Sequence, residues 1–136
     1  MVKLIVGLKG SGKTKALIDM VNSTVESTDG TVICIEQGTK LVREIKYQAR
    51  LIDTNEYNVT TWRALYGFVA GLIAGDHDAA DIFIDSLLKM FGNNMEEFAS
   101  FIRAVEPLTD KQGVRLTITS SIAPDDLPAD LLQYLA

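Results

Sequence analysis

The sequence predicts an α/β protein, a three-layer α/β/α sandwich with a mainly parallel five-stranded sheet. Short apolar runs alternate with amphipathic helical patterns from one end of the chain to the other. The runs are apolar on both faces, which is typical of parallel strands that helices cover on both sides. A length of 136 residues suits one domain, residues 1–136, with right-handed crossovers between its strands.

Five apolar runs are predicted to be strands, because each is short, rich in β-branched or aliphatic residues and bounded by polar or glycine-containing segments. They are Lys3–Val6, Thr31–Ile35, Arg50–Asp53, Asp81–Ile84 and Arg115–Thr119.

Helices are predicted between these runs from apolar periodicity and from residues that can cap a helix. The first follows the run at residues 3–6, with Ala16, Leu17, Met20 and Val21 at helical spacing. The others are expected at Lys40–Gln48 after Thr39, from Thr60 or Thr61 to Ala74, at Met95–Val105 after Asn93 or Asn94, and at Ala129–Leu135 after Pro124 and Pro128. Gly75–Asp78 and Asp110–Gly113 are predicted to be loops that lead into the last two strands.

The composition is that of a globular protein, with 47% hydrophobic and 23% charged residues and a net charge of −5. This acidic balance disfavours non-specific nucleic-acid binding, although Lys40, Arg43, Lys46 and Arg50 could form a local basic face. No run reaches the ~18 apolar residues of a membrane span. Cys34, the single cysteine, is predicted to be a buried hydrophobe. A cytoplasmic location is therefore expected.

A glycine-rich stretch, GLKGSGKT at residues 7–14, follows the first predicted strand and opens the first predicted helix. It matches the pattern G-x-x-x-x-G-K-[ST], in which glycines let backbone N–H groups point at phosphate oxygens. The positive end of the following helix adds to this attraction. The residues predicted to bind the phosphates are Gly7, Lys9, Gly10, Ser11, Gly12, Lys13, Thr14 and Lys15.

With this loop in its strand–loop–helix setting, the first 25 or so residues resemble the Walker A region of the P-loop NTPases. The resemblance implies a nucleoside triphosphate bound with Mg²⁺ at the carboxyl ends of the strands. It also implies that Lys13 bridges the β- and γ-phosphates and that Thr14 contacts Mg²⁺. ATP is favoured because the Asn-Lys-x-Asp stretch of typical GTP-binding proteins does not occur. Leu8 stands where ParA/MinD-type proteins have an additional lysine, so that subfamily is not assigned.

The same resemblance calls for an aspartate at the end of an apolar strand, and Asp85 is the candidate for the catalytic and Mg²⁺-binding carboxylate. Asp53 is a rival and Glu36 a weaker one. Many ATPases of this superfamily place a glutamate next, but Ser86 stands there, so activation of water within the chain is in doubt. By the same resemblance, Thr119 and Ser120 end the last predicted strand where such ATPases have a polar residue that senses the γ-phosphate; the alternative is that they are ordinary strand-end hydroxyls.

Three functions fit these residues. The first is a small Mg²⁺-dependent ATP-binding protein, a slow ATPase or switch whose site a partner or second subunit completes. The second is a nucleoside or nucleotide kinase with a thymidine-kinase-like layout, although the Asp-Glu pair and zinc-binding cysteines of those enzymes are absent. The third is a nucleotide-gated interaction module without enzymatic activity.

Overall fold

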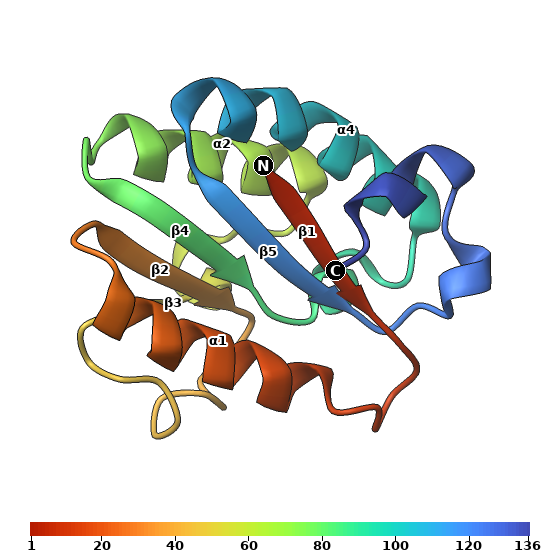
Figure 1. Ribbon diagram of the computed structural model, residues 1–136. Coiled ribbons are helices and arrows are strands. Elements are labelled where there is room, and N and C mark those ends of the chain that lie inside the picture. Colours follow the sequence, from red (N-terminus) through yellow and green to blue (C-terminus); the bar gives the residue numbers. More distant parts are fainter.

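The protein is a five-stranded, entirely parallel sheet with helices packed against it, described for residues 1–136 by a computed structural model (Figure 1). The strands lie in the order β1-β5-β4-β2-β3. Their bounds are β1 Val2–Val6, β2 Thr31–Glu36, β3 Arg50–Asp53, β4 Ala79–Ile84 and β5 Arg115–Ser120. The prediction of an α/β fold with a five-stranded parallel sheet is therefore confirmed, and every predicted strand is present.

Helices lie on both faces of this sheet, with α1 (Lys13–Ser27) on one and α2 (Trp62–Ala74) and α4 (Met95–Gln112) on the other (Figure 1). Successive strand residues point to opposite faces. Cys34 and Phe83 accordingly pack with α1 in the smaller core, whereas Ile35 and Ile82 belong to the larger core beneath α2 and α4. No helix is both long enough and apolar enough to cross a membrane.

Residues 40–48 form a series of turns and not the predicted helix. Tertiary hydrogen bonds replace the helical pattern there. The carboxylate of Glu36 accepts from the backbone N–H groups of Lys40 and Leu41, at 3.2 and 3.0 Å. The side chain of Asn22 binds both the carbonyl of Glu44 and the N–H of Lys46, at 2.8 and 2.9 Å.

The helix predicted at Met95–Val105 is longer than expected and ends at Gln112, so the predicted loop at Asp110–Gly113 is wrong except for its glycine. Pro107 lies inside the helix, and the buried stripe continues past it to Thr109. Gly113 ends the helix in a left-handed conformation, with φ of 69°.

Of the capping residues predicted for the two middle helices, Thr61 and Asn94 are the ones that form the cap. The Thr61 side chain accepts from the N–H of Ala64, and the Asn94 side chain accepts from the N–H of Glu97. The predicted C-terminal helix at Ala129–Leu135 is present as a 3₁₀-helix, η3 (Ala129–Tyr134). Three short elements were not predicted. They are η1 (Thr54–Tyr57), α3 (Leu87–Phe91) and η2 (Pro124–Asp126).

Candidate functional site

The glycine-rich loop joins β1 to α1 at the carboxyl edge of the sheet (Figure 1). Gly10 and Gly12 have φ of 85° and 87°, a left-handed conformation that side chains rarely adopt. Gly12 caps α1 without any side-chain hydrogen bond, so the first N–H groups of the helix are available to an anion. A Cβ on Gly7 would lie 2.6 Å from the Ser11 hydroxyl, so a larger residue there would force the Ser11 side chain to move.

Lys13 folds back over this loop. Its ammonium group donates to the Leu8 carbonyl at 3.0 Å and to the Ser11 hydroxyl at 3.4 Å. Both bonds lie at the surface and contribute little to stability. An incoming phosphate can therefore draw the ammonium group away from the loop at small cost.

Asp85 lies directly beyond the end of β4, faces α1 and is 8% exposed. The Thr14 hydroxyl donates to its two carboxylate oxygens at 3.2 and 3.4 Å. The Thr119 hydroxyl, from the end of β5, donates to Oδ1 at 2.7 Å and accepts from the backbone N–H of Ser86 at 2.8 Å. These bonds bring the predicted partners Thr14 and Asp85 together although 71 residues separate them.

Thr119 and Ser120 thus differ in their surroundings. The Ser120 hydroxyl is buried and has no hydrogen-bond partner. It is the next residue along β5, so it points to the opposite face of the sheet from Thr119. Of the two predicted sensor positions, only Thr119 lies beside Asp85.

The two rival carboxylates hold backbone segments. Asp53 accepts from the N–H groups of Gly38 and Asn55, at 2.8 and 2.9 Å. Glu36 is 4% exposed and binds the turn at Lys40. Burial raises the pKa of Glu36, and the Asp85 charge adds to this, while the two N–H donors oppose it.

A cavity of about 620 Å³ opens beside the glycine-rich loop, and no hydrophobic residue lines it. Five lysines contribute to its wall: Lys9 and Lys13 belong to the glycine-rich loop, Lys15 to the first turn of α1, and Lys40 and Lys89 to segments far along the chain. The full lining is Lys9, Gly10, Gly12, Lys13, Thr14, Lys15, Lys40, Ser86, Lys89, Asn93 and Ser121. Such a concentration of positive charge is suited to a strongly anionic ligand.

Most of this charge is unneutralised. Among the lysines of the cavity, only Lys15 forms an ion pair, with Asp19 at 2.6 Å. The other salt bridges of the chain are elsewhere, at Glu26–Lys46, Arg103–Asp130 and Asp81–Arg115.

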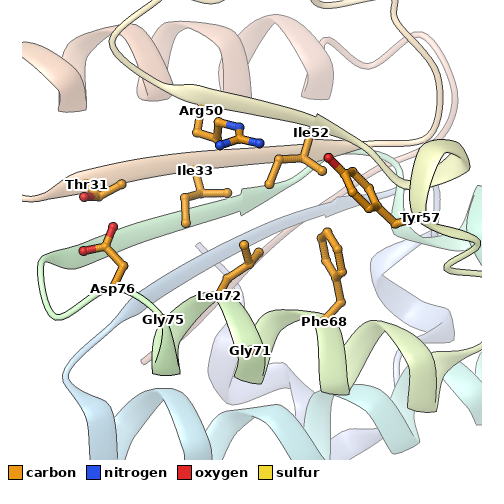
Figure 2. Close-up of a pocket in the computed structure, with 10 residues that line it drawn as sticks. All are labelled: Thr31, Ile33, Arg50, Ile52, Tyr57, Phe68, Gly71, Leu72, Gly75 and Asp76. Atoms are coloured by element: carbon orange, nitrogen blue, oxygen red, sulfur yellow. The ribbon is translucent and has the colours of Figure 1, made fainter.

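A second cavity, of about 390 Å³, lies between α2 and the β2–β3 edge of the sheet (Figure 2). Ile33, Ile52 and Leu72 line it, and Arg50 and Asp76 lie at its margin (Figure 2). None of the predicted phosphate-binding residues borders it. It lies on the face of the sheet opposite α1, and so it is separate from the lysine-lined cavity.

Sequence reasoning missed the contribution of Lys40, Lys89 and Asn93 to the site. Lys40 and Lys89 lie shortly after the ends of β2 and β4, at the edge where the glycine-rich loop was expected, whereas Asn93 comes only after α3. Their position along the chain was therefore a usable signal. The predicted helix at residues 40–48 obscured it for Lys40, and the short helix α3 was not predicted at all.

The other singled-out side chains are structural. Cys34 is completely buried, and its burial, with the nearby charges of Asp85 and Glu36, raises its pKa to about 12. Trp62 and Tyr66 of α2 are partly buried and pack against the larger core.

No protein-family model matches the chain, and no curated protein sequence does.

Proposed function

We propose that this chain binds a nucleoside triphosphate, ATP, with Mg²⁺ at the loop of residues 7–14. The observation that supports this most is the lysine-lined cavity at the start of α1, which lacks hydrophobic lining and holds four unpaired ammonium groups. A polyphosphate supplies the matching negative charge, and the left-handed glycines and uncapped helix start suit its oxygens.

Thr14 and Asp85 fit Mg²⁺. Their hydroxyl and carboxylate oxygens are hard ligands of the kind Mg²⁺ prefers, and they lie 3.2 Å apart. No three His, Cys, Asp or Glu side chains gather into a metal site in this chain. A Mg²⁺ bound through one carboxylate, one hydroxyl and the phosphates does not need such a cluster. When bound, the ion neutralises charge on the phosphates.

Slow hydrolysis is part of the proposal. Ser86 follows Asp85 where many related ATPases have a glutamate, and Glu36 has both carboxylate oxygens engaged by backbone N–H groups. Neither residue is therefore placed to take a proton from water. A slow ATPase or a nucleotide-dependent switch that acts through a protein partner fits this arrangement, as does a cytoplasmic location, where ATP and Mg²⁺ are abundant.

A second candidate is a small nucleoside or nucleotide kinase. The extent of the cavity favours it, because the cavity reaches beyond the glycine-rich loop to Lys40 and Asn93 and has a volume of about 620 Å³. A small acceptor could lie there beside the terminal phosphate.

The test is the fate of the γ-phosphate under saturating Mg²⁺–ATP, with and without a panel of nucleosides and nucleotides. We expect phosphate release well below the ~10 s⁻¹ of a typical enzyme, no phosphorylated acceptor, and loss of the release in Lys13→Ala. Transfer to a member of the panel would establish the kinase instead. Release that is unchanged in Lys13→Ala would contradict both.

A further inference from the structure

Two lysines outside the glycine-rich loop lie close to each other. Lys40 follows β2 and Lys89 lies in α3, just after β4, and these two strands are neighbours in the sheet. Both side chains line the same cavity. The approach of the Lys40 ammonium group, more than partial burial, lowers the pKa of Lys89. Neither lysine is paired with a carboxylate.

Two like charges close together cost free energy when neither forms a salt bridge, so an anion bound between them would be stabilising. The backbone supports this position. The Glu36 carboxylate fixes the N–H of Lys40, and Lys89 lies four residues beyond Asp85, whose charge acts on it favourably.

The two lysines and the glycine-rich loop line the same cavity, but they come from different strand ends. The loop follows β1, whereas the lysines follow β2 and β4, and β5 with Ser121 lies between. If Lys13 bridges the β- and γ-phosphates and Asp85 faces the metal, Lys40 and Lys89 are available in the same cavity as further cations for the γ-phosphate.

We propose that Lys40 and Lys89 bind the terminal phosphate and so make the site selective for a nucleoside triphosphate over a diphosphate. This inference rests on the proposed function and adds to it the residues that distinguish the two nucleotides. It also means that the positive charge at the γ-phosphate comes from this chain itself, without an arginine or lysine from a second subunit.

The experiment is calorimetric titration of ATP and ADP, each with Mg²⁺, into the wild type, Lys13→Ala, Lys40→Ala and Lys89→Ala. Lys46→Ala is the matched control, because Lys46 belongs to the same turn segment as Lys40 but pairs with Glu26 and does not line the cavity. Lys40, Lys46 and Lys89 are exposed and Lys13 is partly exposed, and circular dichroism verifies that each variant is folded.

Removing one charge-assisted hydrogen bond to the terminal phosphate is expected to weaken ATP binding about tenfold, in Lys40→Ala and in Lys89→Ala. ADP affinity should change less than about twofold in both, and Lys46→Ala should match the wild type for both nucleotides. Lys89→Arg should retain most of the ATP affinity, since it keeps the charge.

If Lys40→Ala and Lys89→Ala weaken the binding of ATP and ADP equally, or weaken neither, this inference is wrong. The proposed function would still stand in that case, provided that binding is lost in Lys13→Ala. Absence of nucleotide binding in the wild type, or binding that is unaffected in Lys13→Ala, would overturn both.

Discussion

Replacing Thr119 with valine removes one hydroxyl and almost no volume, so its effect isolates the polar network beneath the glycine-rich loop. The Thr119 side chain is 1% exposed. Its hydroxyl donates to Asp85 Oδ1 at 2.7 Å and accepts from the Ser86 N–H at 2.8 Å. Ser86 has φ of 55°, so this second bond also holds a residue in an unfavourable conformation.

The magnitude follows from these two bonds. A hydrogen bond to a charged group contributes about 1.5–3 kcal/mol, and leaving the Ser86 N–H unpaired costs ~1 kcal/mol at a partly buried site. We expect Thr119→Val to lower the free energy of unfolding by about 3 kcal/mol. For a domain of this size, that corresponds to a fall in Tm of roughly 10 °C.

Urea denaturation followed by circular dichroism measures this change as a lower midpoint at an unchanged m-value. Thr117→Val is the matched control. Thr117 lies on the same strand and face, is 5% exposed, and faces a small cavity beside α1 and not Asp85. We expect that variant to remain within about 0.5 kcal/mol of the wild type. Similar free energies for the two variants would refute the network as a source of stability.

The further predictions concern the metal, the buried thiol and helix α2, which lines the second cavity. Asp85→Asn keeps the shape of the side chain but removes its charge, so the ATP affinity measured by calorimetry should no longer depend on Mg²⁺. If the ATP affinity of this variant still depends on Mg²⁺, the metal is bound elsewhere. Cys34 should resist iodoacetamide at pH 8 until the protein unfolds, because it is fully buried with a pKa of about 12. The pKa of the Cys34 thiol is 9.0 in the unfolded chain and about 12 in the folded protein. The free energy of unfolding should therefore decrease as the pH rises from 9.0 to about 12, and this contribution to the decrease should be absent in Cys34→Ala. Gly71→Ala should raise the free energy of unfolding, measured by urea denaturation, by about 0.5–1 kcal/mol. Alanine favours the helix more than glycine does, and the added Cβ would have no atom within 4 Å. A destabilised variant would mean that this space is filled.

The strands and the site differ in how far the sequence predicts them. Strands such as Ala79–Ile84 are determined by local apolar runs, and the glycine-rich loop by a pattern of eight consecutive residues, so both can be predicted without the structure. Asp85 was predicted because it directly follows such a strand. The helix at residues 40–48 was predicted wrongly, because Glu36 and Asn22 bind its backbone from outside the segment.

The sequence could not predict which residues from distant parts of the chain come together at the site, because this depends on the order of the strands in the sheet. Lys40 and Lys89 meet only because β2 and β4 are neighbours, and strand order is not contained in any local pattern. The same holds for Thr119, whose place between Asp85 and Ser86 depends on β5 lying beside β4.

The most direct measurement is a calorimetric titration of ATP, ADP and GTP with Mg²⁺ into the wild type and Lys13→Ala. Nucleotide binding at residues 7–14 predicts that ATP binds the wild type, that GTP binds more weakly, and that Lys13→Ala abolishes binding while remaining folded. If neither protein binds any of the three nucleotides, or if both bind them equally, the lysine-lined cavity is not a nucleotide site and the proposed function is wrong.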